Sequence, residues 1–167
     1  LNYKASVEIR NKADVLLETM NAVRSYTSTQ VGPRLVQDEI SAQGQVPEFV
    51  RQSVPAYSAR EVFDGLRQKD SYTNFSYREA TLNPTNLRDQ ADEFESKLVQ
   101  KFREDAQLYH QSGYRVLDGE KLFYIARPLT VETSSCLECH GDPRNAPQSL
   151  TNSYGDQRGF GWQLNET

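Results

Sequence analysis

The sequence predicts an α+β domain in which two long helices flank a short antiparallel sheet. Residues 2–31 contain no Gly or Pro and place apolar side chains at helical spacing, and residues 87–111 repeat that pattern. Further along, Asp118-Gly119 separates two β-prone runs, which is typical of a hairpin turn. A chain of 167 residues can bury one sizeable core, so we expect a single domain over residues 1–167.

The N-terminal helix is predicted from about Asn2 to Val31, and Gly32-Pro33 should end it, leaving residues 34–167 as the core. Its apolar side chains step alternately by four and three residues, which gives a heptad-like seam: Ile9, Ala13, Leu16, Met20, Val23 and Thr27. One interpretation is a helix packed on its own domain. The other is a helix that enters from a membrane segment and pairs with its twin in a homodimer, and both can hold along different halves.

Residues 34–54 are punctuated by Gly44 and Pro47, which indicates a loop with a short helical piece. Pro55 is suited to the first turn of a helix, which we expect to reach about Gln68. The apolar side chains on one face of this helix are Ala59, Val62, Phe63 and Leu66.

The segment Tyr72–Leu82 is rich in aromatic and β-branched residues and predicts a strand. The following residues 83–86 predict a turn, with Asn86 as N-cap of the second long helix, from about Leu87 to Gln111. Gly113 should end that helix. The apolar stripe of the helix is Ala91, Phe94, Leu98 and Phe102.

The predicted hairpin joins residues 114–117 to a long apolar strand, Glu120–Leu129, which should be central in the sheet and which Pro128 closes. After it, Ser134 or Ser135 should cap a turn. The residues beyond 140 are rich in Gly, Asn, Pro and Ser and predict no helix. Residues 159–164 predict a last strand or a loop.

The turn carries the most informative motif of the chain, Cys136-Leu137-Glu138-Cys139-His140. This C-x-x-C-H pattern is the attachment signature of a c-type haem. Two thiols three positions apart reach the two vinyl groups of the porphyrin, and the next residue places its imidazole under the ring as iron ligand. The sequence therefore predicts one covalently bound haem c per chain, held by Cys136 and Cys139, with His140 as proximal ligand.

Three other interpretations of the motif are weaker. A thioredoxin-like dithiol would lie within a βαβ pattern, which is absent around Cys136. A structural zinc would need Cys136, Cys139, His110 and His140 together, because the chain has two Cys and two His, and adjacent Cys139 and His140 give a poor tetrahedral bite. A disulfide at this spacing would be strained.

Composition limits the partners and the cellular location that we expect for this chain. A net charge of −4 argues against a nucleic-acid partner, and no apolar stretch is long enough to span a bilayer. The first residue is Leu, which suggests a processed or excised segment. Haem c is normally attached outside the bacterial cytoplasm, so we expect a periplasmic or otherwise extracytoplasmic location. We expect no enzymatic activity.

The position of the motif separates the chain from two familiar haem classes. Small electron-carrier cytochromes usually have the motif near the N-terminus, and four-helix cytochromes of the c-prime type have it on the last helix. Here it follows a sheet and precedes a segment without predicted helix. Helices around a short antiparallel sheet, with haem on a late loop, favour a PAS-like fold.

Five segments together resemble one known family: Ala22–Arg24, Val54–Phe63, Glu79–Arg88, Phe123–Pro128 and the C-x-x-C-H element. It is the c-type-haem, PAS-like sensor domain from the periplasmic part of bacterial, often cyanobacterial, signal transducers. The resemblance covers nearly the whole chain and implies a sensory domain for redox state or a small gas. It also implies that the domain signals through a membrane-linked transducer.

The second axial ligand decides between electron exchange and gas binding. The resemblance implies a Cys at this position in some relatives, but this chain has no spare Cys. Met20 is the only Met and is the ligand we single out, although it lies in the helical seam, where Met usually fills a core. His110, Tyr57 or Tyr26, and an open or water-held site remain alternatives.

Arginines are the expected partners of the haem propionates, because the guanidinium fork matches a carboxylate. Arg78 and Arg127 lie in predicted strands and are the two candidates, with an ordinary surface role as the alternative. The function that these observations favour is a haem c sensor. A single-haem electron-transfer cytochrome c is the runner-up, and a peroxidase-like enzyme would need a distal acid–base group that His110 is poorly placed to supply.

Overall fold

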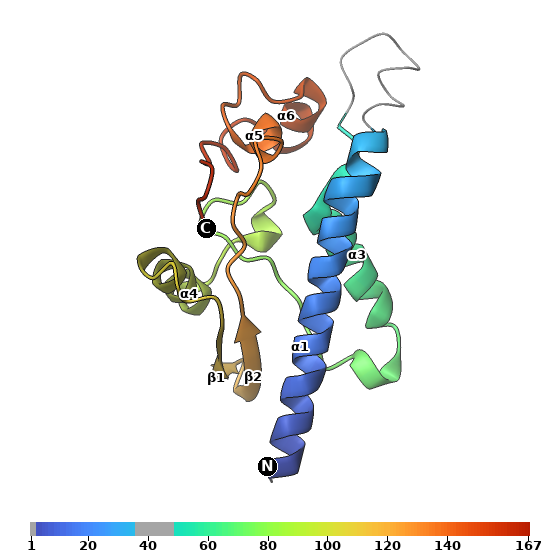
Figure 1. Ribbon diagram of the computed structural model, residues 1–167, viewed down its shortest axis with the longest axis vertical. Helices are drawn as coiled ribbons and strands as arrows, with labels where there is room; N and C mark the ends of the chain where they lie inside the picture. The colour runs from blue at the N-terminus through green and yellow to red at the C-terminus, as the bar shows by residue number, and fades with distance from the viewer. Residues whose placement is uncertain (1–2, 36–48) are drawn as a thin grey trace.

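The structure is a computed structural model that describes residues 3–35 and 49–167. The predicted helix start at Asn2 and the punctuating Gly44 and Pro47 lie outside the described residues. The long helix α1 (Tyr3–Tyr26) runs along the longest dimension of the molecule, with α3 (Pro55–Leu66) beside it (Figure 1). A β-hairpin and α4 (Glu93–Glu104) lie on the other side of α1, and the short α5 (Cys136–His140) and α6 (Gln148–Tyr154) lie toward its C-terminal end.

The prediction that Gly32-Pro33 ends the first helix is wrong. After Tyr26 the chain widens into a π-helical segment, Thr27–Val31, and remains helical through residues 32–35. Proline lacks an N–H and its ring crowds the preceding turn, so a widened turn before Pro33 lets the helix continue past it. Gly32 has helical backbone angles, and a Cβ there would lie 3.3 Å from the Ser53 carbonyl oxygen.

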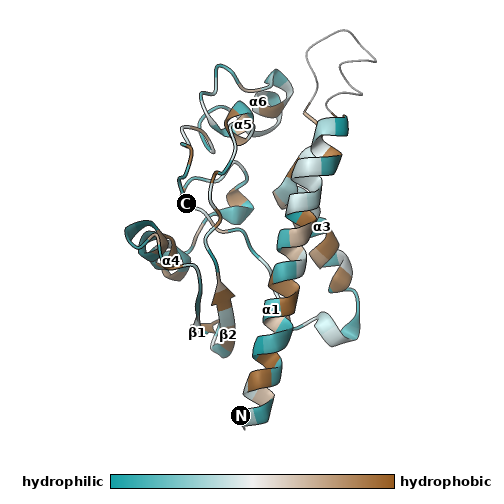
Figure 2. Ribbon diagram, viewed as in Figure 1, coloured by the Kyte–Doolittle hydropathy of each residue, from teal (hydrophilic) through white to brown (hydrophobic). Residues whose placement is uncertain are grey.

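The apolar core joins α1 to α3. Met20, Ala59 and Phe63 are almost completely buried, and partly buried Leu16, Val23, Phe75 and Tyr77 pack around them. The seam of α1 therefore faces its own domain, as the first of the two interpretations predicted, and its apolar residues alternate with polar ones along the helix (Figure 2). Pro55 opens α3 at N1 as expected. Of the apolar side chains predicted to share one face of α3, Ala59 and Phe63 are buried, whereas Val62 is 48% exposed.

The hairpin is confirmed. Strands β1 (Gln111–Leu117) and β2 (Glu120–Ala126) pair antiparallel. Asp118 and Gly119 both have positive φ, 52° and 82°, as a type I′ turn requires. In the described part of the chain this sheet has two strands, so β2 is not central, and it ends before the predicted Leu129.

The strand predicted at Tyr72–Leu82 is also wrong. The segment begins in a 3-10 turn, η3 (Asp70–Tyr72), and continues without a partner strand apart from one isolated bridge between Thr81 and Gln90. Its aromatic side chains serve the α1–α3 core instead, since Phe75 and Tyr77 pack there. β-Propensity reflects side-chain packing as much as backbone preference. Here the aromatic side chains are packed although the segment does not pair with a neighbouring strand.

The second long helix is shorter than predicted at both ends. Asn86 does act as an N-cap, but of the 3-10 turn η4 (Leu87–Asp89), where its side chain accepts from the Arg88 N–H. α4 begins after Asp92, which forms a capping box with Glu95. Such a reciprocal cap fixes the start of a helix more strongly than periodicity does. Gly113 is not a helix end, because it pairs with Tyr124 inside the sheet.

The C-terminal region contains a helix that the sequence did not predict. α6 follows Pro147 and ends at Gly155, so the exclusion of helix after residue 140 was wrong. Ser135 precedes α5 without a side-chain cap hydrogen bond. The last residues fold back as a loop, where Val131 exchanges backbone hydrogen bonds with Asn165 and Glu166.

The predicted α+β class, with a long N-terminal helix and a small antiparallel sheet, is thus confirmed. Among the helices of the described residues, none has the length and apolar character that crossing a bilayer requires.

Candidate functional site

The C-x-x-C-H residues form one short helical turn, α5, on the C-terminal side of the hairpin. The turn is closed by backbone hydrogen bonds from the Cys136 N–H to the Thr133 carbonyl (3.2 Å) and from the Gly141 N–H to the Leu137 carbonyl (2.9 Å). Both cysteines are free and partly buried. Residues three apart on a helix lie on the same side, so the two thiols are placed to reach one common group.

The surroundings of the Cys139 thiol favour its protonated form. Burial, with a smaller contribution from the Glu138 charge, raises the pKa of Cys139. The Cys136 sulfur lies 3.4 Å from the Thr133 hydroxyl. Redox-active thiols in C-x-x-C turns usually have lowered pKa values, so this environment does not favour the dithiol interpretation.

His140 is held in one orientation by the C-terminal loop. Its Nδ1 lies 2.8 Å from the Gly159 carbonyl oxygen, and its ring stacks on Trp162 with centroids 3.9 Å apart and planes inclined by 5°. The Trp162 N–H in turn donates to the His140 carbonyl (3.0 Å). Burial lowers the pKa of His140, although the hydrogen bond to Gly159 acts in the opposite direction.

This geometry assigns the tautomer of a neutral His140. A carbonyl oxygen only accepts, so Nδ1 must carry the proton that it shares with Gly159. The other ring nitrogen, Nε2, then has a free lone pair, which is the state in which imidazole binds a metal. The site thus combines two thiols on one turn with a pre-oriented metal-binding nitrogen.

The Gly159 carbonyl is itself fixed by the turn at residues 83–86. The Asn83 side chain accepts from the Gly159 N–H (3.0 Å) and donates to the Phe160 carbonyl (3.0 Å). Sequence reasoning assigned Asn83 to turn chemistry alone and so missed this role. A partner 76 residues away leaves no local pattern, and the one available signal was the glycine-rich C-terminal run.

The candidates for the second axial ligand make the following contacts. Met20, the candidate singled out from the sequence, is buried in the α1–α3 core, where its neighbours come from α1, α3 and residues 75–77. His110 precedes β1 instead of ending a helix, and its Nε2 lies 4.0 Å from an Asp14 oxygen. Tyr26 is 62% exposed, and Tyr57 lies under the Arg60 guanidinium. Over residues 3–35 and 49–167, no three His, Cys, Asp or Glu side chains are grouped to hold a metal, so the four zinc ligands considered above are not assembled.

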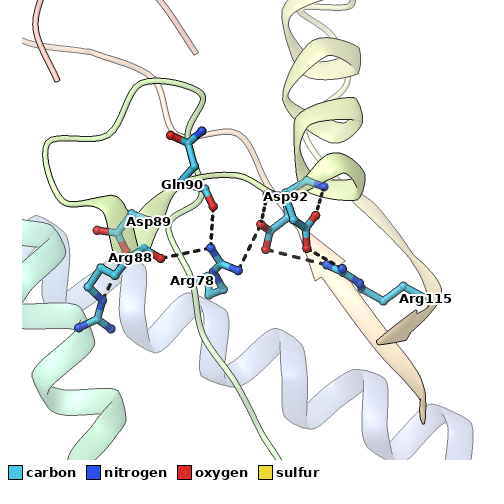
Figure 3. Close-up of polar contacts among 7 residues, drawn as sticks. Arg78, Arg88, Asp89, Gln90, Asp92 and Arg115 are labelled. Carbon is cyan, nitrogen blue, oxygen red and sulfur yellow. Dashed lines mark hydrogen bonds and ion pairs between the residues drawn. The ribbon is translucent and has the colours of Figure 1, made fainter. Parts of the chain in front are cut away.

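Arg78 and Arg127 already have partners away from α5. Arg78 donates to the Arg88 and Gln90 carbonyls, at 3.2 and 2.9 Å, as Figure 3 shows. It also pairs with Glu95. Its neighbour in this network is Arg115, which pairs with the capping residue Asp92 at 2.7 Å. Together these contacts tie the residues before α4 to β1.

The partners of Arg127 come from α1, where it pairs with Asp14 (3.5 Å) and Glu18. These ion pairs join the end of the hairpin to the long helix. The two arginines therefore tie structural elements together, and the structure brings neither of them to Cys136, Cys139 or His140 through a hydrogen bond or ion pair among the described residues.

Three arginines of the described structure have a buried Nε without a hydrogen-bond partner: Arg60, Arg115 and Arg127. The Arg60 side chain is 16% exposed, its Nε is buried without a hydrogen-bond partner in the described structure, and its ion pair with adjacent Glu61 is long, at 4.0 Å. Sequence reasoning missed it, although Arg60 stands three residues before buried Phe63 and so shares its face of α3. A charge on a buried face is the signal that could have identified it.

Comparisons with known proteins place this site in a family context. The family model described as Tll0287-like matches residues 2–167. Among solved structures, the chain is similar to the crystal structure of the cyanobacterial heme-protein Tll0287, with a TM-score of 0.61 and 15% sequence identity over 95% of this chain and 88% of that one. At this identity the match establishes a shared fold. The search of curated proteins found no match.

Proposed function

Because this chain belongs to the Tll0287-like family, we propose that it binds a haem, attached covalently as haem c, and acts as a sensory domain. The similar solved structure is that of a heme-protein, which supports the first part of the proposal. The C-x-x-C-H turn supports covalent attachment, since both thiols are free and lie on one helical turn.

The single observation that carries the proposal is the state of His140. Its Nδ1 is committed to the Gly159 carbonyl, and Nε2 is left as a metal-binding nitrogen. Haem-ligating histidines need this second hydrogen bond, because it fixes the tautomer and the ring orientation. Stacking on Trp162 adds a second restraint on the ring plane. The residues present therefore fit a haem c, with Cys136 and Cys139 as attachment points and His140 as proximal ligand.

Arginine partners for the haem propionates belong to the same proposal. Arg78 and Arg127 were proposed from the sequence, but their guanidinium groups are already paired within the described structure. The Nε atoms of Arg60 and Arg127 are both buried without a partner in the described structure. Arg60 is the better-suited candidate, because its ion pair with Glu61 is long, at 4.0 Å, whereas Arg127 is paired with Asp14 and Glu18, and an anionic oxygen would satisfy the Arg60 guanidinium. We therefore add Arg60 to the proposed haem-binding residues.

When bound, the haem supplies either electron exchange or the binding of a small gas. A sensor additionally requires two protein states with different affinity for the signal. The element best suited to differ between such states is α1, since it contacts both α3 and β2 and carries the buried Met20. We propose that α1 transmits the signal to a membrane-linked transducer from an extracytoplasmic, homodimeric domain, without enzymatic activity.

Absorption spectra of the oxidised, reduced and gas-treated protein test this function. Protein should be produced in a host with a working haem-ligation pathway. A haem spectrum that changes on addition of carbon monoxide or nitric oxide supports gas sensing. An unchanged six-coordinate spectrum in both redox states and with both gases would favour the electron-transfer cytochrome, and a spectrum without haem bands would contradict the proposal entirely.

A further inference from the structure

We propose that Asn83 is a positioning residue for the proximal ligand: by holding the Gly159 carbonyl, it fixes the proton on His140 Nδ1 and so sets how strongly Nε2 binds iron. This inference rests on the proposed haem function and extends it to a residue that lies 57 positions before His140 in the sequence. In the described structure Asn83 makes no hydrogen bond to the imidazole or to the thiols; it acts through the backbone.

The two Asn83 hydrogen bonds lie on either side of the Gly159 carbonyl along the backbone. Its Oδ1 accepts from the N–H of Gly159, on one side of that carbonyl, and its Nδ2 donates to the carbonyl of Phe160, on the other side. Both are 3.0 Å long. The Gly159 carbonyl between them then points at His140 Nδ1, at 2.8 Å.

The carboxamide is the side chain that this arrangement requires. The backbone presents one donor and one acceptor in sequence, and an amide of this length offers an acceptor and a donor at once. An Asp carboxylate could accept from Gly159 but could not donate to Phe160, and Ala would do neither. The identity of residue 83 is therefore matched to the loop, not only to its own turn.

The turn that carries the Asn83 side chain is held by close packing. Pro84 is fully buried and restricts the turn backbone, and Thr85 packs directly against Gly159. A Cβ added to Gly159 would lie 2.0 Å from the Thr85 hydroxyl oxygen, and the residue has a φ of +78°. Two further backbone bonds, from Gly161 to the Gly141 carbonyl (2.8 Å) and from Trp162 to the His140 carbonyl (3.0 Å), fasten the loop to α5.

The consequence for a bound iron follows from the chemistry of imidazole. A hydrogen bond from Nδ1–H to a carbonyl makes the ring a stronger electron donor, and loss of such outer partners typically weakens metal binding by about 10- to 100-fold. Ferric iron profits more than ferrous iron from a strong donor. Releasing the Gly159 carbonyl should therefore shift the ferric–ferrous equilibrium toward the ferrous state.

The test compares Asn83→Ala, Asn83→Asp and the matched control Asn86→Ala in the haem-loaded protein. Asn86 belongs to the same turn and caps η4, where its side chain accepts from the Arg88 N–H instead of bonding to the C-terminal loop. We expect Asn83→Ala to shift the one-electron equilibrium about tenfold toward ferrous haem, which corresponds to about 59 mV, with Asn83→Asp shifted less and Asn86→Ala unshifted. Potentiometric titration followed by absorption measures the shift.

The outcomes separate three cases. Equal potentials for wild type and both Asn83 variants, with covalent haem retained, would overturn the role of Asn83. Equal shifts in Asn83→Ala and Asn86→Ala would show a general effect of the turn and would also overturn it. If Asn83→Ala does not fold, the potentials of Asn83→Asp and Asn86→Ala are compared instead. A shift in Asn83→Asp alone supports the role of Asn83, and equal potentials of the two variants would overturn it. Wild-type protein without haem would instead contradict the proposed function itself.

Discussion

Two regions of this molecule are stabilised in different ways. The α1–α3 region has an apolar core, in which Met20, Ala59 and Phe63 exclude water almost completely. In residues 131–167, the buried apolar side chains are Val131 and Leu150, and the region is organised by hydrogen bonds between distant backbone segments. Apolar packing tolerates substitution by side chains of similar volume, whereas a hydrogen-bonded loop depends on particular donors and acceptors.

The difference suggests that the two regions have different roles. The helical region is suited to hold its shape and to carry a displacement along α1. The C-terminal region is suited to present two thiols and one imidazole with defined orientation. The Gly159 carbonyl and the Trp162 ring both restrain the His140 imidazole. Substitutions in the first region should therefore change stability, and substitutions in the second should change the haem spectrum.

The largest expected effect concerns the emission of Trp162, the only Trp of the chain. Because it stacks on His140, a bound haem would lie close enough to quench nearly all of its fluorescence. A double variant, Cys136→Ser with Cys139→Ser, should recover the emission. Steady-state fluorescence of matched preparations measures this, and equally bright emission from both proteins would contradict haem binding at this site.

Replacement of Met20 separates packing from ligation. We expect Met20→Ala to lower the free energy of unfolding by about 2–5 kcal/mol, since it leaves a cavity between α1 and α3. Met20→Leu retains the volume and should cost less than about 1.5 kcal/mol. Both variants should keep the wild-type visible spectrum of the reduced protein. A spectral change in Met20→Leu would instead identify the Met20 sulfur as the axial ligand.

Two glycines with the same backbone angle test the loop over His140. Gly155 and Gly159 have φ of +80° and +78°, but a Cβ at Gly155 meets open space, while one at Gly159 collides with Thr85. Gly155 combines this φ with a ψ of −179°, a region occupied essentially by Gly alone, so we expect Gly155→Ala to cost about 1–3 kcal/mol through backbone strain alone. Gly159→Ala should cost more and should also alter the haem spectrum. Urea unfolding and absorption measure both, and indistinguishable variants would contradict the proposed loop geometry.

The smallest effect is a pH dependence at Asp92. Burial opposes its ionised form, but hydrogen bonds from Arg115 and from the Glu95 N–H outweigh burial and lower the pKa. A lowered folded-state pKa stabilises the fold above the unfolded pKa of about 4, and this stability is lost as the pH falls through the folded value. Asp92→Asn should therefore be less stable by about 0.5–1 kcal/mol at pH 7, a modest figure because the side chain is 35% exposed.

The stabilities of wild type and Asp92→Asn should converge as the pH falls below the lowered folded-state pKa of Asp92. Chemical unfolding at several pH values gives the comparison. A constant difference between wild type and Asp92→Asn over the whole range would show that the ion pair with Arg115 has no net effect on stability.

The parts of the fold that local sequence determines were predicted well. The hairpin followed from Asp118-Gly119, and the start of α3 followed from Pro55. Errors arose where tertiary structure outweighed local preference. The segment predicted as a strand at 72–82 packs its aromatic side chains without a partner strand, and the π-helical turn at Thr27–Val31 carries α1 past a proline.

In the candidate site, too, the residues of the local motif could be predicted and their distant partners could not. The C-x-x-C-H motif is local, so Cys136, Cys139 and His140 could be proposed from spacing alone. The partners that orient His140 could not be predicted. Gly159 and Asn83 are separated from it by long stretches of chain, and their relation exists only after the C-terminal loop has folded back.

The most direct test of the central claim is the mass and colour of the denatured polypeptide. Protein from a host with a working haem-ligation pathway should be unfolded, extracted with acidified organic solvent and measured by mass spectrometry and absorption. Covalent attachment at Cys136 and Cys139 requires that the chain stays red and that its mass exceeds that of the bare polypeptide by one haem. A colourless chain of the bare mass would contradict the claim.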